Sequence, residues 1–247
     1  MFLPLRQNTI DIYYTDTFSK HWQNSMLHVL NKEELDVYHR YGLEERKIEF
    51  LLGRYLVKNI CSHYLHKKPQ EIIITKNEYG KPYLPGSDVK FNISHSYGVV
   101  ACAATIGAEI GVDIEKISND ITGVVKRFFT PKEIDYLFNL DPGNKNREAY
   151  RLWTMKEAYI KAIGKGLFTP LDSFDLFDLF GEYDVFFYST ELNADYYLSV
   201  ARKNGKNEEN NASVRIFRVV IECIGWLRIT FPWLIPIQNK KLEGYFL

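Results

Sequence analysis

Cysteine is scarce in this sequence, and a surplus of either charge is absent. The 247 residues include three cysteines, and 31 basic side chains balance 31 acidic ones. Because Cys61, Cys102 and Cys223 show no C-x-x-C spacing, a disulfide framework or a zinc ribbon is disfavoured and a reducing, cytoplasmic environment is expected. The missing basic surplus argues against a protein that wraps nucleic acid, although it leaves local segregation of charge open.

Long hydrophobic runs are missing as well. Residues 1–8 lack the apolar core of a signal peptide, and charged residues and prolines interrupt the longest apolar stretch, near the C-terminus. Since no apolar run reaches the roughly 20 residues that span a membrane, no membrane partner is expected. The composition, 46% hydrophobic and 25% charged, is that of an ordinary globular protein with one large domain or two small ones.

Local start and stop signals predict three helical segments. Residues 31–66 carry apolar side chains at helical spacing, and Asn31 with Glu34 forms a capping box at the start. In 130–133, Thr stands at the N-cap, Pro at the first helical position and Glu at the third, which predicts a second helix start. A third helix is predicted over 147–163, closed by the glycines that follow it.

Strand signals lie between and after these helices. The β-branched run 72–75, the apolar run 99–106 and the alternating segment 110–116 are typical of strands, and aromatic and β-branched residues suggest more over 174–200. The Gly and Pro content of 78–82 predicts a turn. Helices beside antiparallel strands indicate the α+β class.

Two acidic residues of the alternating strand are candidate metal ligands. Asp113 and Glu115 are two residues apart, so their side chains emerge on the same face. Neighbouring carboxylates repel each other and favour a hard divalent cation between them. The alternative is the solvent-facing side of an edge strand, and a motif this short leaves both interpretations open.

The helix over 147–163 offers a third carboxylate. Glu157 and Lys161 lie four residues apart on one helix face, and Trp153 with Ile160 shares a stripe that anchors the helix to the core. One interpretation is a surface ion pair on an amphipathic helix. The other places a carboxylate and a phosphate-binding ammonium together, and three oxygen ligands with phosphate and water suit octahedral Mg²⁺.

Other polar residues have both a structural and a functional interpretation. His95 is flanked by two serine hydroxyls just before a buried strand, where a loop can present side chains to a ligand, although a lone histidine is more often structural. Lys81, in the turn 78–82, would ordinarily be a solvated lysine. Arg54 and Lys58, four residues apart on the early helix, form a cationic patch that could equally well be solvated.

Taken together, these segments resemble the 4′-phosphopantetheinyl transferases, specifically the larger, surfactin-synthetase type. The matching stretches, in the family's order and spacing, are 78–82, 91–96, 110–116, 127–129 with Glu133, and 153–167 with 170–174. The resemblance covers residues 78–174 well and 31–60 more weakly. It implies an α+β fold of two similar halves related by pseudo-two-fold symmetry, with the active site between them.

The resemblance also implies an activity and its partners. The family transfers the phosphopantetheine arm of coenzyme A to a serine of an acyl or peptidyl carrier protein and releases adenosine 3′,5′-bisphosphate, a holo-(acyl-carrier-protein) synthase reaction. A monomer is expected from the length. The halves are expected over 1–108 and 109–205. Residues 206–247 depart from the family and are expected to be an added strand and helix, a partner-binding surface or a tail.

Site residues follow by the same resemblance. Asp113, Glu115 and Glu157 would bind Mg²⁺. The coenzyme A site would comprise Lys81, Ser94, His95, Asp113 and Lys161. Glu157, Lys161 and His95 would act in catalysis, with Glu157 as the best candidate to take the proton of the carrier serine, directly or through water.

Two alternatives compete with this activity. A metal-dependent phosphohydrolase or nuclease also uses clustered carboxylates, but it would not explain the ordered Gly-Lys-Pro, Ser-His-Ser and Trp-x-x-Lys-Glu segments. A non-catalytic relative would bind coenzyme A or carrier proteins without transfer; the three acidic positions and Lys161 count against it. The basic residues that read the 3′-phosphate of coenzyme A are left unassigned.

Overall fold

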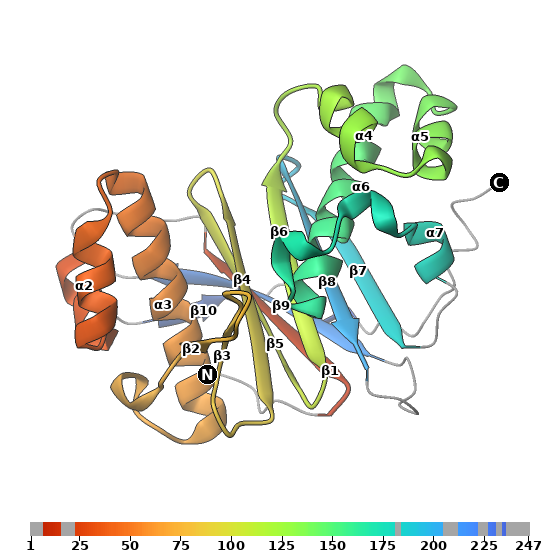
Figure 1. Ribbon diagram of the computed structural model, residues 1–247. Helices are drawn as coiled ribbons and strands as arrows, with labels where there is room; N and C mark the ends of the chain where they lie inside the picture. Colours follow the sequence, from red (N-terminus) through yellow and green to blue (C-terminus); the bar gives the residue numbers. More distant parts are fainter. Residues whose placement is uncertain are drawn as a thin grey trace.

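A computed structural model describes residues 7–15, 23–180, 184–204, 212–221, 227–230 and 234–235 (Figure 1). Within these ranges no helix is long and apolar enough to cross a membrane. Cys61 and Cys102 are buried free thiols, whereas Cys223 and much of the segment 206–247 lie outside the described ranges.

The larger sheet joins strands from both ends of the chain. Its order is β10-β9-β1-β5-β4, and β11 pairs with β9. β1 lies between β5, to which it is antiparallel, and β9, to which it is parallel. The strands are β1 (Thr9–Thr15), β4 (Val89–Ser96), β5 (Val99–Ile106), β9 (Ser213–Ile221), β10 (Leu227–Thr230) and β11 (Leu234–Ile235). The apolar run predicted to be a buried strand is β5.

A buried ion pair joins the C-terminal strand β9 to β1. Arg215 Nε and Nη2 donate to the two carboxylate oxygens of Asp11 over 2.5 and 2.7 Å, and Tyr64 of α3 (Glu44–Leu65) donates to the same carboxylate over 2.6 Å. Asp11 is fully buried. The pair therefore connects two strands and a helix that are far apart in the sequence.

The N-terminal helical region is divided rather than continuous. Helix α2 (Lys32–Arg40) follows the short α1 (Gln23–Met26), and its predicted capping box between Asn31 and Glu34 is confirmed. The expected single helix over 31–66 is wrong, because the chain is extended at Tyr41 before α3 begins. Gly42 lies in this break, and glycine has a low helix propensity.

The segment after α3 contains less strand than predicted. Pro69–Glu71 is a 3-10 turn, and only Thr75 of the β-branched run joins a strand, β2 (Thr75–Lys76). The predicted turn follows and leads into β3 (Pro82–Tyr83), with Gly80 at φ +87°. A positive φ suits glycine, which has no Cβ to clash.

The second half has a smaller antiparallel sheet of order β6-β8-β7. Its strands are β6 (Glu109–Lys116), β7 (Val185–Leu192) and β8 (Tyr196–Lys203), and its helices are α4 (Thr122–Phe128), α5 (Pro131–Phe138), α6 (Pro142–Ile163) and α7 (Leu176–Leu179). Thr130 and Glu133 form the predicted capping box, and Gly164 closes α6 at φ +76°. Helix α6 begins earlier than predicted. The expected strand content over 174–200 is wrong for its first part, which contains α7.

Two long helices and two sheets make four layers (Figure 1). Leu56 of α3 belongs to a core with Val100, on one face of the large sheet. Ala101, on the opposite face, belongs to a second core with Val112 of β6. Ala158 of α6 packs on the outer face of the small sheet. Each half is thus a 22-residue helix on a sheet, which fits the α+β fold of two similar halves.

Candidate functional site

Side chains of β4 take the place of a backbone ladder where the two halves meet. Three polar residues on one face of β4 each accept a hydrogen bond from a backbone N–H of β6. The distances are 3.0 Å from Val112 to Asn92, 3.4 Å from Ile114 to Ser94 and 3.2 Å from Lys116 to Ser96. Because a side chain reaches further than a backbone carbonyl, β6 can adjoin β4 while it pairs with β8.

The same two serines orient the carboxylates predicted to bind metal. Ser94 Oγ donates to Asp113 Oδ1 over 2.9 Å, and Ser96 Oγ donates to Glu115 Oε2 over 2.8 Å. Asp113 is 3% exposed, so the solvent-facing alternative is wrong for this residue. Asp113 and Glu115 are thus each held by a hydroxyl from the other half of the molecule.

Helix α6 reaches the same place because Gly111 of β6 lacks a side chain. A Cβ atom there would lie 2.0 Å from the Ala158 carbonyl oxygen and 2.4 Å from the Ala162 nitrogen. The close approach brings Lys161 Nζ to 2.6 Å from Asp113 Oδ1 and 3.0 Å from Ser94 Oγ. Lys161 therefore makes its ion pair with Asp113, and the alternative of a surface pair with Glu157 is wrong.

Electrostatics couple Glu157 to Asp113 and Glu115 of β6. Burial, together with the charges of Asp113 and Glu115, raises the pKa of Glu157 to about 7, although Lys161 opposes this shift. The pKa of Glu115 is raised by burial and by Asp113, and is lowered by the Ser96 hydrogen bond. Three carboxylates in one low-dielectric region disfavour each other's ionisation.

Hard oxygen donors of this kind suit Mg²⁺. In the described part of the chain, Asp113 Oδ2 is buried and accepts no hydrogen bond, which leaves an anionic oxygen that a cation would satisfy. In the described ranges, no three His, Cys, Asp or Glu side chains are close enough together to hold a metal ion, and this includes the three carboxylates. The chemistry of the donor set and the orphaned oxygen fit a divalent cation.

The expectation that His95 lies in a loop before the buried strand is wrong, because His95 belongs to β4. Its side chain is 39% exposed and its Nδ1 lies 3.2 Å from Glu49 Oε2 of α3. Burial lowers the pKa of His95, and the Glu49 carboxylate acts in the opposite direction. The charges of Lys161 and Asp113 also reach the imidazole, so His95 is electrostatically linked to the carboxylate cluster.

Lys81 directly precedes β3, and its side chain lies against the beginning of β6, away from Asp113 and Glu115. Its Nζ donates to Glu109 over 2.7 Å and to the Ala162 carbonyl over 2.9 Å. Burial lowers the pKa of Lys81, and Glu109 partly offsets this. Because Glu109 precedes Asp113 by four strand residues, these two positions are about 13 Å apart along β6. Lys81 is not the solvated lysine of the structural alternative.

The predicted cationic patch on α3 is a buried ion pair. Lys58 is fully buried, with Nζ 2.5 Å from Glu34 Oε2 and 2.9 Å from the Val29 carbonyl. Arg54 Nε lies 3.2 Å from Glu34 Oε1. The capping carboxylate of α2 therefore pairs with both cations, and neither is solvated.

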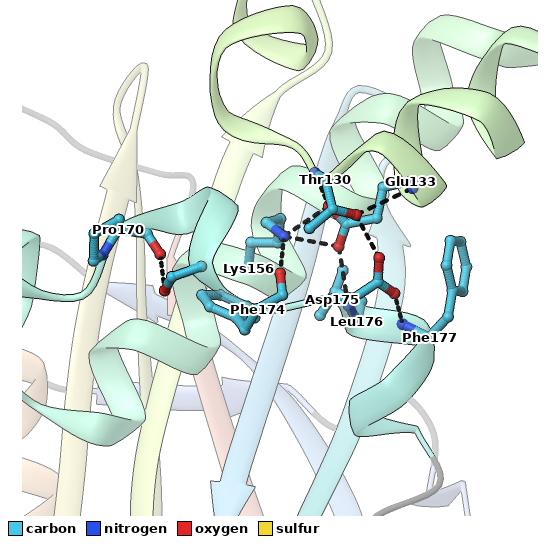
Figure 2. A network of polar contacts seen from close by, with 9 residues as sticks. Thr130, Glu133, Lys156, Pro170, Phe174, Asp175, Leu176 and Phe177 are labelled. Carbon is cyan, nitrogen blue, oxygen red and sulfur yellow. Dashed lines mark hydrogen bonds and ion pairs between the residues drawn. The ribbon is translucent and has the colours of Figure 1, made fainter.

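A second buried pair anchors α6 (Figure 2). Lys156 Nζ is 2.7 Å from both oxygens of Glu133 and donates to the Phe174 carbonyl over 2.9 Å. Glu133 also accepts hydrogen bonds from the backbone N–H groups of Thr130 and Leu176. Lys156 and Glu133 are fully buried, so this network fixes α6 against α5 and the segment before α7.

Sequence reasoning missed four residues that shape the site: Asn92, Ser96, Gly111 and Glu49. The period-two spacing of Asn92, Ser94 and Ser96 was an available signal, since alternate strand residues share a face. Gly111 and Glu49 carried no signal, because their importance comes from contacts with α6 and His95.

Comparisons with known proteins place this chain in an enzyme class. Residues 109–214 match the 4′-phosphopantetheinyl transferase superfamily, and residues 16–107 match the 4′-phosphopantetheinyl transferase N-terminal domain. The transferase Sfp of Bacillus subtilis is 36% identical over 166 residues, which are 67% of this chain and 74% of the relative. The transferase gsp of Aneurinibacillus migulanus is 36% identical over 63% of this chain and 65% of its own length.

The chain belongs to the 4′-phosphopantetheinyl transferases, and within them to the Sfp type. It is an enzyme of the transferase class, and its co-substrate is coenzyme A. The family match reaches residue 214, so the expected departure from the family over 206–247 is wrong for residues 206–214. Strands β9, β10 and β11, which follow, belong to the large sheet.

Proposed function

We propose that this enzyme transfers the 4′-phosphopantetheine arm of coenzyme A to the serine of an acyl or peptidyl carrier protein in a Mg²⁺-dependent reaction. Asp113, Glu115 and Glu157 would hold the metal. The observation that carries this proposal is the buried oxygen of Asp113 without a hydrogen bond, beside two carboxylates whose pKa values are raised. A bound Mg²⁺ neutralises pyrophosphate charge and stabilises the charge that develops in transfer.

The remaining residues bind the co-substrate. Lys161, already paired with Asp113, is the cation that can face a phosphate beside the metal ligands. His95, at the exposed end of β4, is proposed for a second phosphate. Ser94, beside Lys161, and Lys81, at the Glu109 end of β6 against the last turn of α6, are proposed for the nucleotide part of the site.

Glu157 is the proposed proton acceptor. The serine oxygen forms a bond to the β-phosphorus of coenzyme A, the pyrophosphate P–O bond breaks, and adenosine 3′,5′-bisphosphate leaves. The serine proton passes to Glu157, directly or through water. Without the metal the pKa of Glu157 is about 7, and a bound cation would lower it, so the carboxylate is ionised and able to accept a proton at neutral pH.

The cellular setting is proposed on sequence grounds. Free cysteines support a cytoplasmic enzyme, and the length supports a monomer. The balanced charge argues against a nucleic-acid partner, and the lack of a long apolar run argues against a membrane partner. We also propose halves bounded at 1–108 and 109–205, with 206–247 as a C-terminal extension whose strand β9 returns to the first half.

The test is the intact mass of apo carrier proteins after incubation with the enzyme, coenzyme A and Mg²⁺. The expected result is a phosphopantetheine adduct that is absent with a serine-to-alanine carrier and absent when a chelator is added. Absence of an adduct on any of several acyl and peptidyl carriers, with coenzyme A bound, would favour the non-catalytic relative. Breakdown of coenzyme A without a carrier would favour the phosphohydrolase.

A further inference from the structure

Glu49, near the start of helix α3, contacts His95 of strand β4. One oxygen of its carboxylate, Oε2, lies 3.2 Å from His95 Nδ1 and accepts a hydrogen bond from Arg46 Nη1 over 3.2 Å. The Glu49 side chain is 14% exposed, whereas that of Arg46 is 58% exposed and that of His95 is 39% exposed. A largely covered carboxylate thus contacts two more accessible side chains, a guanidinium and an imidazole.

Arg46 differs from other basic residues of this region. Lys58 and Arg54 both pair with Glu34 in the interior, and Lys47 pairs with Glu44 one turn away. Arg46 reaches His95 through the shared carboxylate. Because this contact crosses from α3 to β4, an incidental pair within the helix does not account for it.

The geometry at the imidazole has a chemical consequence. With Nδ1 directed at Glu49, the second ring nitrogen, Nε2, is turned away from that carboxylate, since the two nitrogens are on opposite sides of the ring. An imidazole between a carboxylate and a phosphate donates to both when it is protonated. Carboxylate partners fix tautomer and ring orientation in this way at other histidine sites.

We propose that Glu49 is a positioning residue for coenzyme A: its carboxylate holds the His95 ring and the Arg46 guanidinium side by side, so that both donate to one phosphate group. The proposal rests on the proposed role of His95 and adds a residue that does not itself touch the co-substrate. Four charged groups act on His95: Glu49 and Arg46 from α3, Asp113 from β6 and Lys161 from α6. Of these, Glu49 is the one within ion-pair distance.

The first test measures coenzyme A binding by calorimetry in the presence of a chelator, so that neither metal nor turnover contributes. We expect E49A to weaken binding about tenfold and E49Q, whose amide oxygen can still accept from Nδ1, to weaken it about threefold. Glu45 on the same helix is exposed, so E45Q removes the same charge as a matched control and should bind as wild type.

Three results would overturn the positioning role. Unchanged affinity in E49A would remove it, as would a lower Tm with unchanged affinity, which indicates a purely structural residue. Tighter binding in E49A would mean that the carboxylate only repels the phosphate. The expected partial rescue by E49Q separates positioning from these cases.

A second readout does not depend on coenzyme A. Histidine ring signals followed by NMR, with His95 assigned from H95N, should show a lower pKa for His95 in E49Q than in wild type, because the carboxylate favours the imidazolium. An unchanged His95 titration would overturn the contact. If wild-type protein binds no coenzyme A, the proposed function fails, and this titration still decides whether Glu49 holds the ring.

Discussion

Ser96 shows how one hydroxyl can control a carboxylate. It donates to Glu115 and accepts from the Lys116 backbone, so S96A removes both bonds at once. Since a hydrogen bond to a charged group contributes about 1.5–3 kcal/mol, we expect at least a tenfold higher Mg²⁺ concentration at half-maximal turnover. The KM for the carrier should change little.

The matched control for this prediction is S173A. Ser173 also donates through its hydroxyl, but to the Pro170 carbonyl at an exposed position outside the carboxylate cluster. Its Mg²⁺ dependence should equal that of wild type. Equal Mg²⁺ curves for S96A and S173A would mean that Ser96 does not orient Glu115.

Glu157 gives a pH dependence with a defined sign. Its pKa rises from 4.5 to about 7 on folding, so between these values the folded state holds a proton that the unfolded state has lost. Metal-free protein should therefore lose stability as pH rises from about 4.5 to 7. We expect about 1–2 kcal/mol, less than the full linkage value because the side chain is only partly covered.

Denaturant unfolding in a chelator, from pH 5 to 8, measures this effect. The comparison is wild type against E157Q, since the amide does not titrate and the difference isolates one carboxylate. A difference that is flat across this range would show that Glu157 ionises normally in the folded protein. A difference that grows with pH in favour of wild type would reverse the sign.

At the scale of elements, the contact between β6 and α6 depends on Gly111. G111A would place a Cβ 2.0 Å from a helix carbonyl, so α6 must move. Because overpacking against backbone costs about 1–3 kcal/mol or more, we expect that loss of stability together with loss of turnover, as Glu157 and Lys161 leave Asp113. Thermal unfolding and the carrier-mass assay measure the two effects.

Gly123 offers the matched control. It lies in α4, and a Cβ there would meet no atom within 4 Å. Alanine is favoured over glycine in a helix by about 1 kcal/mol, so G123A should be neutral or slightly stabilising. Similar losses in G111A and G123A would contradict the close-approach explanation.

Helix starts were predictable because their signals are local. The capping boxes at Asn31 and Thr130 need only residues three apart, and both are confirmed. The break at Tyr41 and the early start of α6 at Pro142 were not predicted, because tertiary packing decides how far a helix extends. The strand alternation around Asp113 was correct for a similar local reason.

The site itself was only partly predictable. Strand and helix spacing marked the carboxylates and Lys161 as candidates, and the resemblance assigned roles to them and to His95. The structure brings Asp113, Ser94 and Lys161 into direct contact. What the sequence did not provide is how Ser96 and Glu49 hold these groups. Each contact joins positions separated by 19 residues or more, and one sequence without relatives carries no signal for such a distance.

At the scale of the whole molecule, the pair between Arg215 and Asp11 ties the C-terminal strand to the first one. R215A would leave Asp11 buried without its cation. Since breaking a buried pair costs about 3–5 kcal/mol, we expect a loss of that size in urea unfolding.

An exposed pair provides the comparison. Arg147 and Glu191 form an ion pair 2.8 Å long in which both side chains are accessible to solvent. R147A should cost about 1 kcal/mol or less, because surface pairs contribute little. Equal effects of R215A and R147A would show that the buried pair does not hold β9.

The parallel pairing of β1 with β9 has a consequence for synthesis. The central strand β1 is made first, but its neighbour β9 leaves the ribosome roughly 200 residues later, after every other element of the two halves. The first half therefore waits with one edge of β1 uncovered until β9 has been synthesised. Folding of the halves cannot be strictly sequential, and a shortened first half would expose an adhesive strand edge to other chains.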